Sequence, residues 1–146
     1  MKFKVYLICI LLLCVCNVGY TQNIETIILH HTGEDNIDFS AKDIDRMHKQ
    51  RGWKGIGYHY VIRREGIIEK GRPDYVIGAH AKNRNKNSIG IVLSGRDMTL
   101  DQKVCLSLLL RKMVKRYNIK NIERHHEECP GDSVPVEKLN NYFCSE

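Results

Sequence analysis

The chain has 146 residues and a formal net charge of +6, with 42% hydrophobic and 27% charged residues. This length accommodates one domain with a substantial core and is too short for two ordinary domains. The lysines and arginines form no long basic tract, which argues against a nucleic-acid-binding protein.

The N-terminal segment has the layout of a secretory signal peptide. Lys2 and Lys4 provide a basic start, and the almost wholly apolar run Val5–Val18 is short for a membrane span. Small residues at positions 19 and 21 favour cleavage after Thr21. A retained membrane anchor is the alternative, but the pattern favours a cleaved signal peptide.

These features predict the domain organisation. We expect a signal peptide over residues 1–21 and a single domain over residues 22–146, secreted or periplasmic and without a stable membrane anchor. Loss of the two N-terminal lysines lowers the formal net charge from +6 to +4. A charge of this size suits an anionic partner such as a cell-wall polymer, and it is also ordinary for solubility.

Hydrophobic periodicity divides the rest of the chain into strands and helices of one α/β unit. Capping boxes at Ser40 and Thr99 predict two helix starts. In chain order we expect a strand over 24–30, a helix between 40 and 52, a hairpin of strands 58–63 and 67–70, an extended segment over 75–80, a strand over 88–93, a helix from 99 to about 117, a strand over 121–125 and a short helix over 135–143. This order predicts a central mixed β-sheet flanked by helices.

Three potential metal ligands lie at or near the ends of predicted strands. His30 ends the first strand, His125 ends the last, and Cys129 follows four residues later. Imidazole and thiolate are ligands that zinc prefers, and three protein ligands leave a fourth position open for water. Side chains at strand ends are well placed to converge. The sequence therefore suggests a hydrolytic zinc enzyme.

The cysteines beyond the signal peptide are odd in number. Cys105, Cys129 and Cys144 remain. In an exported protein this suggests one disulfide and one thiol with another function. We expect a Cys105–Cys144 disulfide, with Cys129 as the metal ligand.

Four motifs together resemble a known family. They are Ile27-Ile28-Leu29-His30-His31-Thr32; Gly52-Trp53 followed by Gly57-Tyr58-His59-Tyr60-Val61-Ile62; Gly78-Ala79-His80-Ala81 leading to Asn87-Ser88-Ile89-Gly90-Ile91; and His125 with Cys129-Pro130-Gly131. Their order and approximate spacing resemble the zinc-dependent N-acetylmuramoyl-L-alanine amidases of type 2, a family that includes amidase-type phage lysozymes and the peptidoglycan-recognition proteins of animals. The resemblance covers nearly all of the chain from Ile24 to Phe143.

The resemblance implies a fold, an activity and roles for individual residues. The implied fold is a mixed β-sheet flanked by helices, with Zn²⁺ in a groove that holds the peptide stem of peptidoglycan or a muropeptide. The resemblance implies that His30, His125 and Cys129 bind zinc, that Tyr58 lies beside the zinc-bound water as a catalytic group, and that His80 lines the groove. We expect Trp53 and Asn87 to join His80 in substrate binding, with a place in the core as the alternative for Trp53. The expected reaction is hydrolysis of the amide bond between N-acetylmuramic acid and L-alanine.

The segment between His125 and Cys129 departs from the family pattern. The family usually has a longer loop there and tends to place a lysine or threonine two residues before the cysteine, where this chain has Glu127. A carboxylate cannot stabilise an oxyanion as lysine does, so we expect Glu127 to act as a general base, with intrusion as a ligand as the alternative. The departure keeps a second function open, namely a protein that binds peptidoglycan without cutting it.

The segment Lys82–Asn87 forms a polar and basic loop. Lys82, Arg84 and Lys86 alternate with asparagines. Two interpretations stand level: the loop is simply solvated, or it contacts the acidic stem peptide or glycan.

Overall fold

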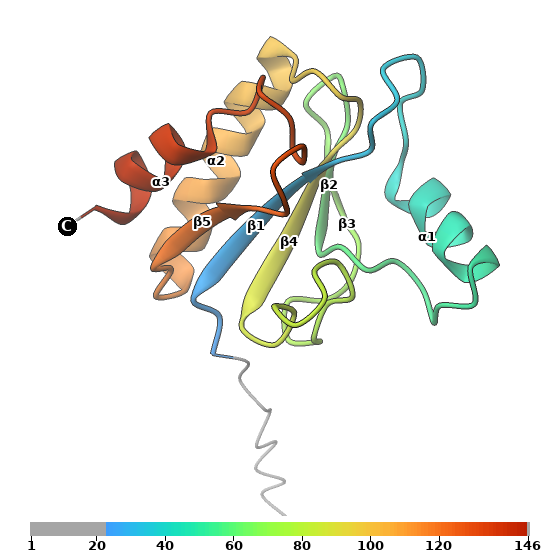
Figure 1. The fold of residues 1–146 in the computed structure, drawn as a ribbon, viewed down its shortest axis with the longest axis horizontal. Helices are drawn as coiled ribbons and strands as arrows, with labels where there is room; N and C mark the ends of the chain where they lie inside the picture. The colour runs from blue at the N-terminus through green and yellow to red at the C-terminus, as the bar shows by residue number, and fades with distance from the viewer. Residues whose placement is uncertain (1–22, 146) are drawn as a thin grey trace, which may run out of the picture.

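A five-stranded mixed β-sheet forms the centre of the protein, and three helices lie against it (Figure 1). The computed structural model describes residues 23–145, so the predicted signal peptide over residues 1–21 lies outside the described residues. Within residues 23–145, no helix is both long enough and apolar enough to cross a membrane.

The elements follow the predicted order. They are β1 (Thr26–His31), α1 (Ala41–Gln50), β2 (Tyr60–Ile62), β3 (Ile68–Lys70), β4 (Ser88–Leu93), α2 (Leu100–Arg116), β5 (Asn121–Arg124) and α3 (Val136–Cys144). The strand order in the sheet is β3-β2-β4-β1-β5. β1 pairs in parallel with β4 and β5, β2 pairs in parallel with β4, and β3 is antiparallel to β2. The predicted mixed sheet flanked by helices is confirmed.

Both predicted capping boxes begin helices. Ser40 Oγ accepts a hydrogen bond from Asp43 N–H at 3.1 Å, and the Asp43 carboxylate accepts one from Ser40 N–H at 3.1 Å. Thr99 and Gln102 make the same reciprocal pair at the start of α2, at 3.1 and 3.0 Å. Each box satisfies backbone donors that the first turn of a helix leaves without partners.

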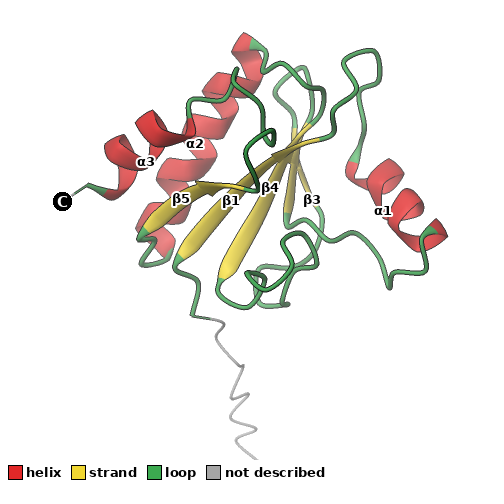
Figure 2. Cartoon of the chain, viewed as in Figure 1, coloured by secondary structure: helices red, strands yellow, loops and turns green. Residues whose placement is uncertain are grey.

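The alternation of side chains along the strands gives the sheet two different faces. Ile27 and Leu29 of β1 belong to the main apolar cluster, together with Leu106 and Leu110 of α2. The opposite face carries a smaller cluster in which Ile44 of α1 packs with buried residues of β2 and β4. Figure 2 shows α2 passing behind the sheet, α3 beside it at the β5 edge, and α1 apart from both. His30 points to the face opposite the main core, because it alternates with Leu29.

The segment Tyr75–His80, expected to be extended, is not a strand. It forms turns, and Val76 N–H donates to the Pro73 carbonyl at 2.9 Å. Its apolar residues Tyr75 and Ile77 are 75% and 50% exposed, so the apolar pattern here does not report burial in the sheet.

The expected Cys105–Cys144 disulfide is absent from the described residues. Both thiols are free. Cys105 lies near the start of α2 beside the turn at Gly66, whereas Cys144 ends α3 and shares a cavity with Val114 near the end of α2. The nine residues from Cys105 to Val114 span about 14 Å of α-helix, and Cα atoms more than about 7 Å apart cannot be bridged without backbone movement. Cys144 therefore lies beside the far end of α2 from Cys105.

The side chain of Gln102 connects α2 to the ends of two strands by hydrogen bonds, and we expect these bonds to stabilise the fold. Its fully buried side-chain amide donates to the carbonyls of Ile62 and Ser94 at 3.0 and 2.8 Å. Gln102→Ala removes the donor to the Ser94 carbonyl, leaves the Ile62 carbonyl with only the Ser94 N–H, and removes the acceptor for the Thr99 N–H. We therefore expect the free energy of unfolding to fall by roughly 3 kcal/mol. Urea denaturation measures the change. The matched Gln50→Ala, at an exposed position of α1, should change it by less than about 0.5 kcal/mol. Equal effects would contradict this account.

Candidate metal centre

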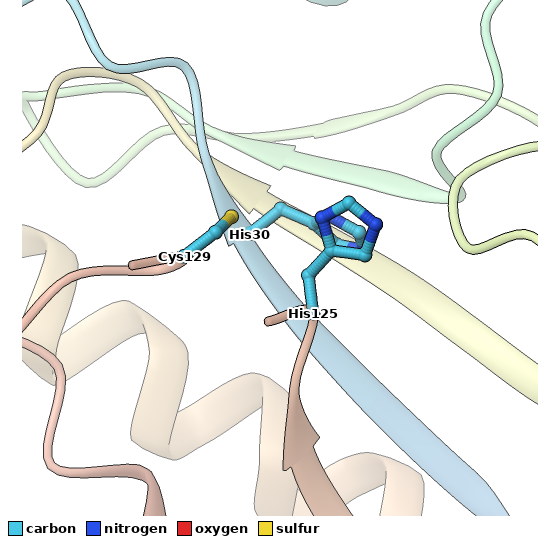
Figure 3. A group of neighbouring side chains, drawn as sticks. All are labelled: His30, His125 and Cys129. Atoms are coloured by element: carbon cyan, nitrogen blue, oxygen red, sulfur yellow. The ribbon is translucent and has the colours of Figure 1, made fainter. Parts of the chain in front are cut away.

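The parallel pairing of β1 and β5 brings His30 and His125 together. Leu29 pairs with Arg124, so the next residue of each strand lies at the same edge of the sheet. His125 N–H donates to the Leu29 carbonyl at 3.2 Å, and the two imidazole centroids are 4.5 Å apart. Cys129 completes a cluster in which one ligand atom from each residue lies within 4.8 Å of the others (Figure 3).

The short segment after His125 returns the chain to the cluster as a tight turn. His126 and Cys129 exchange two backbone hydrogen bonds, at 3.2 and 3.1 Å. The His31 ring fastens this turn to β1, with Nε2 lying 3.0 Å from the Glu128 carbonyl oxygen. The shortened loop is therefore compatible with a three-residue cluster, because the turn places Cys129 beside the strand ends.

The donor set and its spacing fit zinc. Two imidazoles and one thiolate form a typical zinc ligand set, and tetrahedral coordination at the usual bond lengths separates ligand atoms by roughly 3.3–3.6 Å. In this structure the upper limit is 4.8 Å, so the ligand atoms would draw closer together on binding the metal. His30 and Cys129 are 1% and 6% exposed, so the site is shielded on the sheet side.

The surroundings keep the imidazoles neutral and the thiol protonated. Burial holds the pKa of His30 well below its ordinary value, with further contributions from His80 and His125. Burial also lowers the pKa of His125, assisted by His126 and Arg84. Burial raises the pKa of the Cys129 thiol, and a hydrogen bond from the His31 backbone opposes this rise. Both imidazoles thus offer lone pairs at neutral pH, whereas Cys129 must lose a proton to become a ligand.

Tyr58 lies beside the cluster with its proton retained. Its ring meets the His30 ring edge-on, with centroids 4.9 Å apart. Burial, and then the neighbouring Cys129, raises the pKa of Tyr58 to about 12. At neutral pH its hydroxyl is therefore available as a hydrogen-bond donor.

Comparison with known proteins places this site in a family. The family model described as N-acetylmuramoyl-L-alanine amidase matches residues 20–132. The chain belongs to this amidase family. The endolysin of Escherichia phage T7 is 31% identical over 119 residues, which cover 75% of this chain and 79% of the endolysin.

Solved structures of similar proteins share the fold. The N-acetylmuramoyl-L-alanine amidase LysC from Clostridium intestinale has a TM-score of 0.76 and 38% identity, covering 84% of this chain and 87% of LysC. A tyrosine-to-phenylalanine variant of Drosophila peptidoglycan-recognition protein LB, solved in complex with tracheal cytotoxin, has a TM-score of 0.71 and 26% identity. That match covers 84% of this chain and 83% of the recognition protein.

Of the three predicted substrate-binding residues of this amidase-family chain, His80 contacts the cluster directly. Trp53 is connected to it through the rings of His48 and Tyr58. His80 Nδ1 lies 3.1 Å from His30 Nε2, and burial, followed by neighbouring histidines, lowers the pKa of His80 to about 3. Trp53 is 44% exposed and its ring centroid lies 4.5 Å from that of His48, which in turn contacts Tyr58. Their predicted roles stay predictions.

Asn87 lies away from the cluster, and Glu127 is on the adjoining turn without being part of it. Asn87 precedes β4, where its carbonyl accepts hydrogen bonds from the start of β1. The register pairs Thr26 with Ser88 and His30 with Val92, so Asn87 lies roughly 15 Å along the sheet from the level of His30. Glu127 is exposed on the turn before Cys129 and lines a cavity of about 680 Å³ beside Asp97. Neither residue belongs to the three-residue cluster, and their predicted roles stay predictions.

The sequence did not reveal two residues that support the amidase-family site. The Arg84 guanidinium binds the Glu123 carboxylate at 3.0 Å, the Arg124 carbonyl at 3.3 Å and also the His125 carbonyl. This basic loop residue is therefore bound to the end of β5. Gly90 is the second, because a Cβ there would overlap the ring of His80. Both roles depend on contacts between distant segments, although Gly90 lies within one of the family motifs.

Zinc binding should release about one proton from the Cys129 thiol in the neutral pH range, in addition to any proton lost from water at the open position. The lowered pKa values leave His30 and His125 unprotonated, whereas the raised pKa keeps Cys129 protonated. Zinc affinity should therefore rise at least roughly tenfold per pH unit upward from about pH 7, and the contribution of the thiol should level off only above its raised pKa. Calorimetric titration in buffers of different protonation enthalpy measures the released protons.

Cys105 provides a matched control for this prediction. Cys105→Ala should leave the proton release unchanged, because the thiol lies outside the cluster. Cys129→Ala should remove the proton that the thiol releases and most of the affinity. Zinc affinity that does not vary with pH would contradict the assignment of Cys129 as the titrating ligand.

Proposed function

We propose that this chain is a secreted or periplasmic zinc amidase that hydrolyses the amide bond between N-acetylmuramic acid and L-alanine in peptidoglycan. The carrying observation is the cluster of His30, His125 and Cys129 at one edge of the sheet, in a chain of the N-acetylmuramoyl-L-alanine amidase family. Three protein ligands leave the fourth position that a catalytic zinc site requires.

The proposed chemistry addresses the two reasons for the stability of an amide. Its carbonyl is a poor electrophile, and water is a poor nucleophile. Zinc held by the cluster would polarise the carbonyl and lower the pKa of water to about 7. The neutral imidazoles of His30 and His125 supply lone pairs for this, and the burial of His30 limits competition from bulk water at that ligand.

Tyr58 and the acidic turn supply the remaining groups. Because Tyr58 keeps its proton at neutral pH, its hydroxyl can donate a hydrogen bond to the oxyanion of the tetrahedral state. Proton transfer to the leaving amine needs an acceptor that then becomes a donor. We assign this role to Glu127, with Glu128 as the neighbouring carboxylate.

The proposed substrate class rests on the family and on one structural relative. The recognition protein LB variant was solved with tracheal cytotoxin, a monomeric diaminopimelic acid-type peptidoglycan. A peptidoglycan fragment or muropeptide is therefore the ligand class that we propose for this chain.

A second candidate function is peptidoglycan recognition without cleavage. The observation that favours it is Glu127, which stands where the family tends to have lysine or threonine and is exposed on the turn rather than part of the cluster. A negative charge there would oppose an oxyanion rather than stabilise it.

Digestion of purified peptidoglycan separates the two functions. We expect the protein to release stem peptides with a new L-alanine amino terminus, detected by mass spectrometry. A chelator should abolish the release, and added zinc should restore it. Cys129→Ala should be inactive, whereas the matched Cys144→Ala, which lies outside the cluster, should remain active. Peptidoglycan that is bound but uncut by zinc-loaded protein would contradict the amidase and support recognition.

Tyr58→Phe tests the proposed hydrogen bond to the oxyanion. Loss of one such donor costs about 100-fold in kcat, so we expect a decrease of that order with zinc content unchanged. The matched Tyr75→Phe removes a hydroxyl from a side chain that is 75% exposed, and should leave kcat unchanged. Wild-type kcat in Tyr58→Phe would refute the assignment.

A further inference from the structure

A chain of hydrogen bonds leads from His30 into the protein. His30 Nε2 lies 3.1 Å from His80 Nδ1, and His80 Nε2 lies 3.3 Å from Ser88 Oγ. Ser88 Oγ donates to the Arg84 carbonyl oxygen at 2.6 Å. His30, His80 and Ser88 are 1%, 8% and 1% exposed, so water does not compete for these hydrogen bonds.

The carbonyl at the end of this chain fixes the direction of every bond. A carbonyl oxygen only accepts, so the Ser88 hydroxyl proton points to Arg84 and the Ser88 oxygen is left to accept from His80 Nε2. A neutral imidazole carries one ring proton, so a proton on Nε2 makes His80 Nδ1 an acceptor. His30 must then carry its own proton on Nε2, which leaves its Nδ1 with a free lone pair.

We propose that His80 is a positioning residue that, with Ser88, holds His30 in the tautomer whose Nδ1 is free to bind the metal. The inference rests on the proposed function in one respect, namely that His30 is a zinc ligand. Histidine ligands commonly donate their second ring N–H to a partner that fixes the tautomer and orientation of the ring. Here that partner is a second imidazole, itself directed by a serine and a backbone carbonyl.

The position of the His80 ring is determined by the backbone around it. A Cβ at Gly90 would overlap the ring, and a Cβ at Gly78 would lie 2.5 Å from its Cδ2 atom. The Asn85 side-chain oxygen accepts from the backbone N–H groups of His80 and Ala81, both at 2.8 Å. The ring is thus confined between two glycines, which keeps Nδ1 directed at His30.

The loop that carries Arg84 connects both imidazole ligands. The Arg84 carbonyl ends the hydrogen-bond chain from His30, and the Arg84 guanidinium binds the His125 carbonyl and the Glu123 carboxylate. His80 therefore acts through His30 rather than by contact with substrate, because both of its ring nitrogens have partners inside the protein.

Two-bond ¹⁵N–¹H correlation NMR of the full protein, stripped of metal, tests the direction of the chain. We expect His30 and His80 both as the Nε2–H tautomer. A proton on Nδ1 of either ring would overturn the proposal. This readout needs neither zinc nor peptidoglycan, so it remains decisive even if the protein proves not to be an amidase.

Zinc affinity, measured by competition with a chelating dye, tests the consequence. His80→Leu should weaken zinc binding about 10- to 100-fold, and Ser88→Ala about tenfold. His80→Asn places an amide oxygen where Nδ1 accepts, so it should recover most of the affinity. Recovery by Asn separates positioning from a purely structural role, and equal loss in the Leu and Asn variants would overturn the proposal.

Ser107→Ala is the matched control for Ser88→Ala. Ser107 Oγ likewise donates to the carbonyl four residues earlier, that of Lys103 at 2.9 Å, but it lies on α2 away from the cluster. We expect wild-type zinc affinity in Ser107→Ala. Wild-type affinity in Ser88→Ala would contradict the proposal, and NMR of the same variant should show the Nε2–H preference of His80 lost.

Discussion

The parallel pairing of β1 with β5 is the constraint on which the candidate site depends. It places His30 and His125 at the same edge of the sheet, held by the hydrogen bond from His125 N–H to the Leu29 carbonyl. The strand order puts β1 between β4 and β5, so the ring of His80 can approach His30 over the bare backbone of Gly90. The tight turn through Cys129 then needs only a few residues to complete the cluster.

Burial determines the protonation states of the side chains at this edge of the sheet. The main core packs on one face of the sheet, and the other face carries both the smaller apolar cluster and the histidines. His30 and His80 are buried there, and burial lowers the pKa of both so that they are neutral. The same burial raises the pKa of both the Tyr58 hydroxyl and the Cys129 thiol, which keeps both groups protonated at neutral pH. A bound metal ion would compensate a thiolate that these apolar surroundings disfavour.

Local signals in the sequence predicted most of the fold. The capping boxes at Ser40 and Thr99 and the apolar run Ser88–Leu93 are encoded by neighbouring residues, and each appears in the structure as expected. Features set by distant contacts were not predictable in this way. The Cys105–Cys144 pairing was wrong because α2 separates the two thiols, and the distance of Asn87 from the cluster follows from the register of β1 and β4. The three-residue cluster was predictable because His30 lies near the end of β1, and His125 and Cys129 follow β5.

Zinc K-edge X-ray absorption of the zinc-loaded protein tests the central claim most directly, because it counts the atoms around the metal. The account predicts one sulfur at about 2.3 Å and three nitrogen or oxygen atoms at about 2.0–2.1 Å, which correspond to Cys129, two imidazoles and one open position taken by water. Two or more sulfurs, or none, would show that the metal does not bind at the strand ends as described.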